Sequence, residues 1–240
     1  MNNPDIKLPE IPIILACNID FNIPESEISW LLSLIRTEKR NRLIRFKYNE
    51  DILRGLLGEL LVKYAFENML NILYQDKDFY ENEFGKPFLR NNNLFFNITH
   101  SGNWCAAAFH NSPIGIDIEE MLLPPYEIMQ DNFSLSEIQY IENALPGDKK
   151  QAFYSVWTLK ESYIKMTGKG LSKELKSISF EIIKGKIIPN LPGNTKGKLT
   201  LHLSNPDNNH ILAVCFTGYT FDTGIKKLTS KELIANTLHK

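Results

Sequence analysis

Two segments of the chain place carboxylates and lysines among apolar residues. Residues 115–119 (GIDIE) alternate like a short strand, so Asp117 and Glu119 share one face. Residues 153–171 (FYSVWTLKESYIKMTGKGL) have the composition of a helix that is apolar nearly all round. Together the segments supply three carboxylates and two ammonium groups: Asp117, Glu119, Glu161, Lys160 and Lys165. Carboxylates suit a hard divalent cation and ammonium groups suit phosphates, so the set predicts a site for a metal-bound diphosphate.

Each of these features also has an ordinary interpretation. Acidic residues at the end of a strand commonly face solvent. Glu161 and Lys165 are spaced i, i+4, and such a pair on a surface contributes only about 0.3–0.5 kcal/mol. A largely buried helix argues against this alternative, because buried charges need partners. A metal ion on the three carboxylates, with phosphates on the two lysines, would satisfy them all.

Three further groups have side chains that bind anions. The hydroxyl of Thr99 and the imidazole of His100 can donate to a phosphate, although a loop histidine without a task is an equal alternative. The turn at residues 84–87 (FGKP) holds a lysine, and its glycine would let the backbone approach a flat ring or a phosphate. The third group is a basic cluster formed by Lys39, Arg40, Arg42 and Arg45. This cluster is either a solvated face or a landing site for an anionic ligand or an acidic partner.

The elements that must position these groups occur in an order that repeats. The first part reads as a strand (11–19), two short helices (24–36, 38–46), a long helix (49–71) and two strands (94–98, 104–109) joined by a loop at 99–103. The second part reads as a strand (114–118), a helix (134–144), a long helix (148–167) and three strands (177–183, 198–204, 210–217). Ser134 and Glu137 have capping-box spacing, which is the simplest role for Glu137. The pattern predicts an α+β fold of two similar halves, residues 1–112 and 113–240, with a short helix in the tail.

Composition excludes several classes of protein. The 240 residues are 43% apolar and 23% charged, which is ordinary for a soluble domain, and the net charge of −1 argues against nucleic-acid binding. No apolar run reaches the roughly 18 residues of a membrane helix, and the polar N-terminus does not read as a secretory signal. Cys17, Cys105 and Cys215 lie singly in apolar runs without metal-ligand spacing. We therefore expect packed thiols and a cytoplasmic location.

Six segments carry motifs in a characteristic order: 38–46 (EKRNRLIRF), 53–59 (LRGLLGE), 84–89 (FGKPFL), 96–102 (FNITHSG), 114–120 (IGIDIEE) and 153–171. They resemble the 4′-phosphopantetheinyl transferases, specifically the longer Sfp-type branch. The specific part is GIDIE followed by W-x-L-K-E-x-x-x-K, because two such motifs on a strand and a helix rarely occur together by chance. The resemblance implies a pseudo-dimeric α+β fold whose active site lies in the cleft between the two halves.

The resemblance also implies a role for each matching residue. Those matching the Mg²⁺-binding acids are Asp117, Glu119 and Glu161. Those matching lysines near the diphosphate of coenzyme A are Lys160 and Lys165. Those matching groups near the 3′-phosphate are Lys39, His100 and, less closely, Arg42. The chain departs from the family pattern at two positions: Arg42 stands where lysine is frequent, and Thr99 stands where many members have serine. Those matching the turn beside the adenine are Phe84, Gly85, Lys86 and Pro87.

The implied reaction moves 4′-phosphopantetheine from coenzyme A to a serine of an apo carrier protein and releases 3′,5′-ADP. Mg²⁺, or Mn²⁺, would bridge the carboxylates and the diphosphate, and Lys160 is expected to protonate the leaving group, with Lys165 as the alternative. The base is open among a metal-bound water, Glu161 and Glu137.

By family analogy the carrier is acidic, and the long form favours secondary metabolism, such as the biosynthesis of nonribosomal peptides, polyketides and antibiotics. A monomer is expected, because the duplication supplies both halves of the site. The rivals are a metal-dependent phosphoesterase that cleaves coenzyme A and a silent module that binds coenzyme A or a carrier protein.

Overall fold

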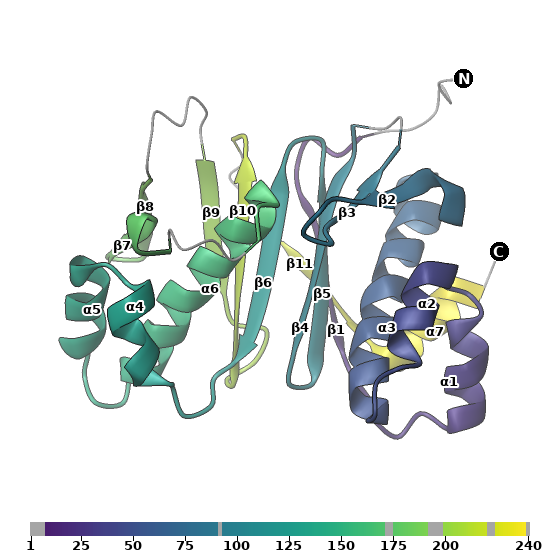
Figure 1. Ribbon diagram of the computed structural model, residues 1–240, viewed down its shortest axis with the longest axis horizontal. Coiled ribbons are helices and arrows are strands. Elements are labelled where there is room, and N and C mark those ends of the chain that lie inside the picture. Colours follow the sequence, from purple (N-terminus) through teal and green to yellow (C-terminus); the bar gives the residue numbers. More distant parts are fainter. Residues whose placement is uncertain (1–7, 91–92, 171–174, 192–198, 220–223, 239–240) are drawn as a thin grey trace. The chain divides into compact units, whose positions relative to one another are not determined.

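The computed structural model describes residues 8–90, 93–170, 175–191, 199–219 and 224–238. The chain divides into two compact units. The first contains Met1–Ser112 together with Asp222–Lys240, and the second is Pro113–Phe221 (Figure 1). No helix in the described ranges is long and apolar enough to cross a membrane.

The first unit is built on a four-stranded sheet of order β11-β1-β5-β4. Its strands are β1 (Ile13–Asn18), β4 (Phe95–Ser101), β5 (Trp104–His110) and β11 (Ile225–Thr229). Its helices are α1 (Glu25–Leu32), α2 (Thr37–Leu43), α3 (Asn49–Tyr64) and α7 (Ser230–Leu238), and a π-helical turn at Ala65–Met69 follows α3. A separate hairpin joins β2 (Phe79–Glu81) to β3 (Pro87–Leu89). The helix α3 packs on β5, β4 and β1, so its leucine stripe forms the core of this unit.

The second unit has a three-stranded sheet of order β6-β10-β9. Its strands are β6 (Ile114–Glu120), β9 (Leu199–Ser204) and β10 (His210–Thr217), and a hairpin joins β7 (Ser179–Ile183) to β8 (Lys186–Asn190). Its helices are α4 (Met129–Asn132), α5 (Leu135–Glu142) and α6 (Lys149–Thr167). The helix α6 packs on β6 and β10 and ends at Gly168, which has the left-handed conformation (φ 68°) that favours glycine at this position.

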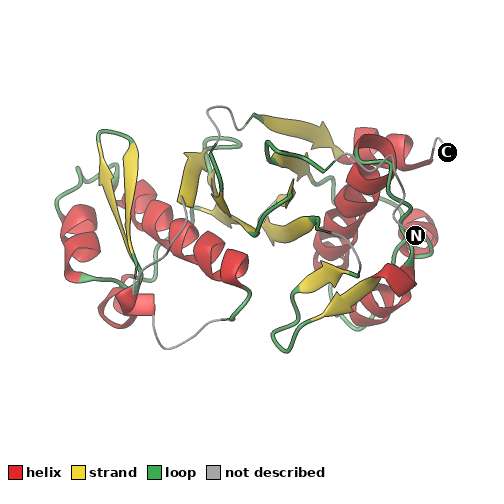
Figure 2. Cartoon of the chain, turned by 90° about the horizontal axis from the view of Figure 1, so that it is seen from above, coloured by secondary structure: helices red, strands yellow, loops and turns green. Residues whose placement is uncertain are grey.

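The topology of the first unit recurs in the second. Three strands of each sheet share one arrangement, in which the first pairs antiparallel with the third and the third pairs antiparallel with the second, so β1-β5-β4 corresponds to β6-β10-β9. The parallel strand β11 is an addition to the first sheet. Each unit also has one long helix on its sheet and a two-stranded hairpin between that helix and the last two strands (Figure 2). The predicted α+β fold with two similar halves is confirmed.

Three sequence expectations need correction. The tail was assigned to the second half, but β11 pairs parallel with β1 and α7 packs on α3, so these residues complete the first unit. The segment Thr99–Ser101 was assigned to a loop, but it continues β4, and Gly102 and Asn103 alone form the turn. The short strands β2, β3, β8 and β11 were not predicted.

Candidate functional site

Strand β6 and helix α6 lie close together because of one glycine. A Cβ added to Gly115 would lie 2.0 Å from the carbonyl oxygen of Ser162 and 2.3 Å from the backbone nitrogen of Met166. Only glycine leaves room for the helix backbone at this distance. Asp117 lies two residues further on the same face of the strand, so its side chain also faces α6.

Asp117 and Lys165 form the shortest described contact of this site. The Nζ of Lys165 lies 2.5 Å from the Oδ1 of Asp117, whose side chain is only 3% exposed. Beside Asp117 in the sheet, the register partner on β10 is Ala213, which is buried in the core of the second unit. The ammonium group therefore stabilises a carboxylate that burial alone would penalise.

Glu161 lies one turn before Lys165 on the same helix. Its Oε1 is buried and accepts no hydrogen bond from the described residues. Burial and then the charge of Asp117 raise the pKa of Glu161, while Lys165 opposes the shift. Two carboxylates thus share one ammonium group, which leaves negative charge that a further cation would neutralise.

Glu119 takes a different position from the other two acids. It lies near the end of β6, is partly exposed, and accepts a hydrogen bond from the Nε1 of Trp157 at 3.3 Å. Within the described ranges, no three acidic, histidine or cysteine side chains are close enough to hold a metal ion together. Asp117 and Glu161 nevertheless fit a hard cation, because they offer carboxylate oxygens, the ligand type that such a cation prefers.

In the first unit, the predicted basic residues lie beside the β2–β3 hairpin. Burial lowers the pKa of Lys39, and the neighbouring Arg42 and Arg36 act in the same direction, whereas Glu59 and Glu81 oppose them. The Nη1 of Arg42 lies 3.4 Å from Glu81 on β2. A group of like charges on one helix face attracts anions.

The turn between β2 and β3 has a fixed conformation. Gly85 has a φ of +77°, which favours glycine, and the Oδ1 of Asn82 accepts the backbone N–H groups of Phe84 and Lys86 at 3.1 and 2.9 Å. Phe84 is 54% exposed, whereas Lys86 is buried with its Nζ 5.6 Å from the ring centroid of Phe88. The predicted turn is confirmed, and it presents an aromatic ring to solvent.

Thr99 and His100 alternate along β4, so Thr99 is buried and His100 is exposed. Arg54, which has no role among the sequence predictions, reaches from α3 to the turn between β4 and β5. Its Nε donates to the carbonyl oxygen of Gly102 at 2.7 Å. The available signal was its position as the one arginine of α3, inside the LRGLLGE motif.

Comparisons with known proteins identify the family of this chain. The model described as "4′-phosphopantetheinyl transferase superfamily" matches residues 113–215, and that described as "4′-phosphopantetheinyl transferase, N-terminal" matches residues 21–112. The 4′-phosphopantetheinyl transferase ffp of Bacillus subtilis is 32% identical over 223 residues, which is 92% of this chain and 99% of that protein. This chain belongs to the 4′-phosphopantetheinyl transferase family.

Two other relatives of this transferase agree. The 4′-phosphopantetheinyl transferase Sfp of Bacillus subtilis (strain 168) is 33% identical over 92% of this chain and 99% of its own length. The 4′-phosphopantetheinyl transferase psf-1 of Bacillus pumilus is 32% identical over 82% of this chain and 85% of its own length. The family inferred from the motifs is confirmed.

Two residues expected in the chemistry of the transferase also have a structural position. Lys160 and Glu137 form an ion pair of 2.8 Å, and both side chains are 0% exposed. The Nζ of Lys160 also donates to the backbone carbonyls of Leu175 and Ile178. These contacts hold the ammonium group of Lys160 inside the second unit, and its predicted place at the diphosphate and protonation of the leaving group stay predictions.

Both carboxylate oxygens of Glu137 are engaged. Its Oε2 accepts the backbone N–H of Ser134 at 2.8 Å, which completes the capping box, and its Oε1 accepts that of Phe180 at 3.0 Å. The predicted capping role is confirmed. Its alternative role as a general base stays a prediction, now for a side chain that is buried in the described part of the second unit.

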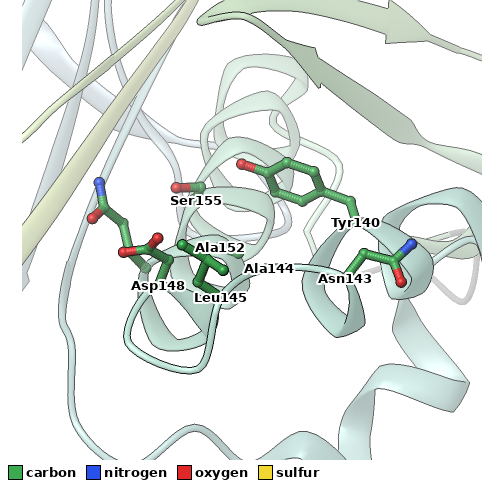
Figure 3. A pocket seen from close by; sticks show the side chains of 8 residues that line it. Tyr140, Asn143, Ala144, Leu145, Asp148, Ala152 and Ser155 are labelled. Atoms are coloured by element: carbon green, nitrogen blue, oxygen red, sulfur yellow. The ribbon is translucent and has the colours of Figure 1, made fainter.

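The second unit of the transferase also has a hollow away from these acids (Figure 3). It lies over the end of α5 and the first turns of α6, and its lining residues are Tyr140, Asn143, Ala144, Leu145, Asp148, Gln151, Ala152 and Ser155. Glu161 and Lys165 lie in the last two turns of α6. The hollow therefore contains none of the predicted site residues.

Proposed function

We propose that this transferase moves the 4′-phosphopantetheine group of coenzyme A to a serine hydroxyl of an apo carrier protein, requires Mg²⁺, and releases 3′,5′-ADP. The observation that carries the proposal is the buried Asp117–Lys165 contact beside the under-neutralised carboxylate of Glu161. These residues occupy the positions of the two motifs that are specific to the family.

Asp117 and Glu161 would hold the metal ion, with Glu119 as the third donor. The buried Oε1 of Glu161, which has no described hydrogen-bond donor, supports this assignment. When bound, Mg²⁺ or Mn²⁺ would neutralise charge on the diphosphate and on the departing oxygen.

Lys165 would stabilise the leaving group. Its side chain is 29% exposed, so its ammonium group can contact both Asp117 and a phosphate oxygen. The serine hydroxyl gives its proton to a general base, for which the carboxylate of Glu161 is a candidate, and its oxygen forms a bond to the β-phosphorus of coenzyme A while the bond from that phosphorus to the 3′,5′-ADP oxygen breaks. An ammonium group held beside that oxygen stabilises its growing charge and can supply its proton.

The first unit would supply groups for the nucleotide end of coenzyme A. We assign the 3′-phosphate to Lys39, His100 and Arg42, with the hydroxyl of Thr99 on the adjacent strand residue. The turn of Phe84, Gly85, Lys86 and Pro87 would lie beside the adenine. The exposed ring of Phe84 and the fixed turn support this assignment, because a rigid aromatic surface suits a flat base.

The proposed function also includes an acceptor, a location and an oligomeric state. The acceptor is an acidic carrier protein, and the transferase works as a cytoplasmic monomer, since the two units of one chain already repeat the same topology.

The test is a mass measurement on the acceptor. The transferase is incubated with coenzyme A, Mg²⁺ and an apo peptidyl carrier protein, and the intact mass of the carrier is recorded. A gain of one phosphopantetheine group that a chelator abolishes is the expected result. An unmodified carrier with cleaved coenzyme A would support a phosphoesterase instead, and an unmodified carrier with intact coenzyme A would support a silent binding module.

A further inference from the structure

A short segment of the first unit exposes apolar and basic side chains together. In residues 44–48, which follow α2, Ile44 is 59% exposed, Phe46 is 51% exposed and Tyr48 is 57% exposed. Arg45 and Lys47 alternate with them and are also exposed. Exposed apolar side chains that alternate with charged ones are typical of a surface that binds another protein.

The backbone of this segment is held in place. The N–H of Ile44 donates to the carbonyl of Arg40 at 3.1 Å, and the N–H of Phe46 donates to the carbonyl of Leu43 at 3.0 Å. Leu43, the residue before the segment, is only 2% exposed and anchors the end of α2 in the core. The Nζ of Lys47 lies 5.2 Å from the ring centroid of Tyr48. The side chains therefore point outward from a defined turn, which lowers the entropy cost of binding a partner.

The charge of the surroundings indicates the sign of the partner. Residues 39–49 contain five cations and no acid: Lys39, Arg40, Arg42, Arg45 and Lys47. The chain as a whole has a net charge of −1, so this concentration of positive charge is local. A basic surface with apolar side chains is complementary to an acidic surface that also carries apolar side chains.

We propose that residues 44–48 are the docking surface for an acidic carrier protein, which would place an acidic amphipathic helix against Ile44, Phe46 and Tyr48. This inference rests on the proposed function, because it takes the acceptor to be a carrier protein. Continuity supports it: the segment directly follows α2, which carries the groups assigned to the 3′-phosphate. The acceptor serine must reach the diphosphate of the same coenzyme A molecule, so the carrier must dock beside the residues that bind it.

The first test reverses two charges. The double variant R45E/K47E is compared with the wild type and with K150E/K231E, a matched double reversal at exposed lysines outside the segment. For R45E/K47E we expect kcat/KM for an apo peptidyl carrier protein to fall about tenfold or more and to lose most of its salt dependence, because charges at an interface act on the association rate. The KM for coenzyme A should change less than about twofold, and the control should match the wild type.

A second variant tests the apolar part. In I44S/F46S we expect a similar fall in kcat/KM for the carrier that is independent of salt, with an unchanged melting temperature, because both side chains are exposed. Unchanged carrier kinetics in both double variants would overturn the docking assignment. So would loss of binding to phosphatidylserine vesicles in R45E/K47E with unchanged carrier kinetics, which would assign the segment to a membrane surface. If the wild type modifies no carrier, the proposed function itself fails.

Discussion

Lys160 and Lys165 lie five residues apart on α6, yet their environments differ. Lys160 is 0% exposed and pairs with Glu137, which the backbone N–H groups of Ser134 and Phe180 also contact. Lys165 is 29% exposed and pairs with Asp117. We therefore expect a phosphate to compete for the ammonium group of Lys165 more readily than for that of Lys160. Burial separates the two lysines, and the following variants test which of them acts on a substrate.

Replacing Glu161 by Gln should abolish transfer while the fold survives. The amide removes one of two neighbouring carboxylates, so kcat/KM should fall at least about 10²-fold, as for the loss of one group that stabilises the transition state. Stability should not decrease, because the substitution removes repulsion with Asp117. Carrier modification by mass and the melting temperature by circular dichroism check the two parts. Retained turnover would contradict the assignment of Glu161 to the site.

Breaking the ion pair between Lys160 and Glu137 should instead lower stability and leave the KM for coenzyme A unchanged. Lys160→Met leaves the carboxylate of Glu137 buried without its cation, which costs about 3–5 kcal/mol. Adding Glu137→Gln should recover part of that loss, because no buried charge then remains unpaired. Urea unfolding of both variants measures the free energies. The folded fraction of each variant should have the KM for coenzyme A of the wild type. A changed KM without a loss of stability would indicate that Lys160 binds coenzyme A.

At the scale of elements, Gly115 sets the distance between β6 and α6. The three atoms that an added Cβ would meet first are all backbone atoms of α6, so the helix cannot yield by rotating a side chain. The contact between Asp117 and Lys165 depends on this distance. A glycine in the strand thus controls the geometry of charges on the helix.

The variant Gly115→Ala should lose both stability and activity. Overpacking of this kind costs about 1–3 kcal/mol or more, and displacement of α6 would separate Asp117 from Lys165. Gly147→Ala is the matched control, because an added Cβ there meets no atom within 4 Å. Thermal unfolding and carrier modification of the two variants measure the effect. Equal behaviour of the two would show that α6 tolerates the shift.

Gly85 and Gly185 allow a second comparison between elements. Each has a φ of +77° in the turn of a two-stranded hairpin, so replacement by Ala should cost a similar free energy, about 1–2 kcal/mol, in both. Only Gly85→Ala should raise the KM for coenzyme A, since only that turn is assigned to the adenine. Equal KM values for the two variants would remove the β2–β3 turn from the binding site.

Elements that are defined by local apolar spacing could be predicted from the sequence, whereas those that depend on partners far away in the sequence could not. The helices α3 and α6 and the central strands carry their signal in local apolar spacing, and the sequence analysis found them. Strand β11 has the partly polar sequence IKKLT, which has no local pattern typical of a strand. Its partner β1 is about 200 residues away in the sequence, so their pairing could not be predicted either. The same limit explains Lys160: helical spacing gives its position on α6 but not the presence of Glu137 on α5. Asp117 and Lys165 could be predicted because both belong to specific motifs.

At the scale of the whole molecule, the first unit is assembled from both ends of the chain. Strand β11 pairs with β1, and Leu228, Leu233 and Ile234 are buried in the core of this unit. Deletion of residues 224–240 should therefore destabilise the first unit, by roughly 1.5–3 kcal/mol for each of these side chains. Hydrogen exchange should show the loss of protection in β1 and α3, while β6 and α6 keep theirs. Uniform loss in both units would indicate that they unfold as one.

The closing of the first sheet by β11 also orders events on the ribosome. The residues that supply the edge strand are made after the second unit, which is a continuous stretch of the chain. At about 5–20 residues per second, the roughly 200 residues between β1 and β11 take on the order of 10–40 seconds to make, and β1 lacks its parallel partner for that time. An unpaired strand edge is a template for pairing with other chains. The nascent transferase should therefore depend most on chaperones while β1 lacks β11, and much less once α7 has covered α3.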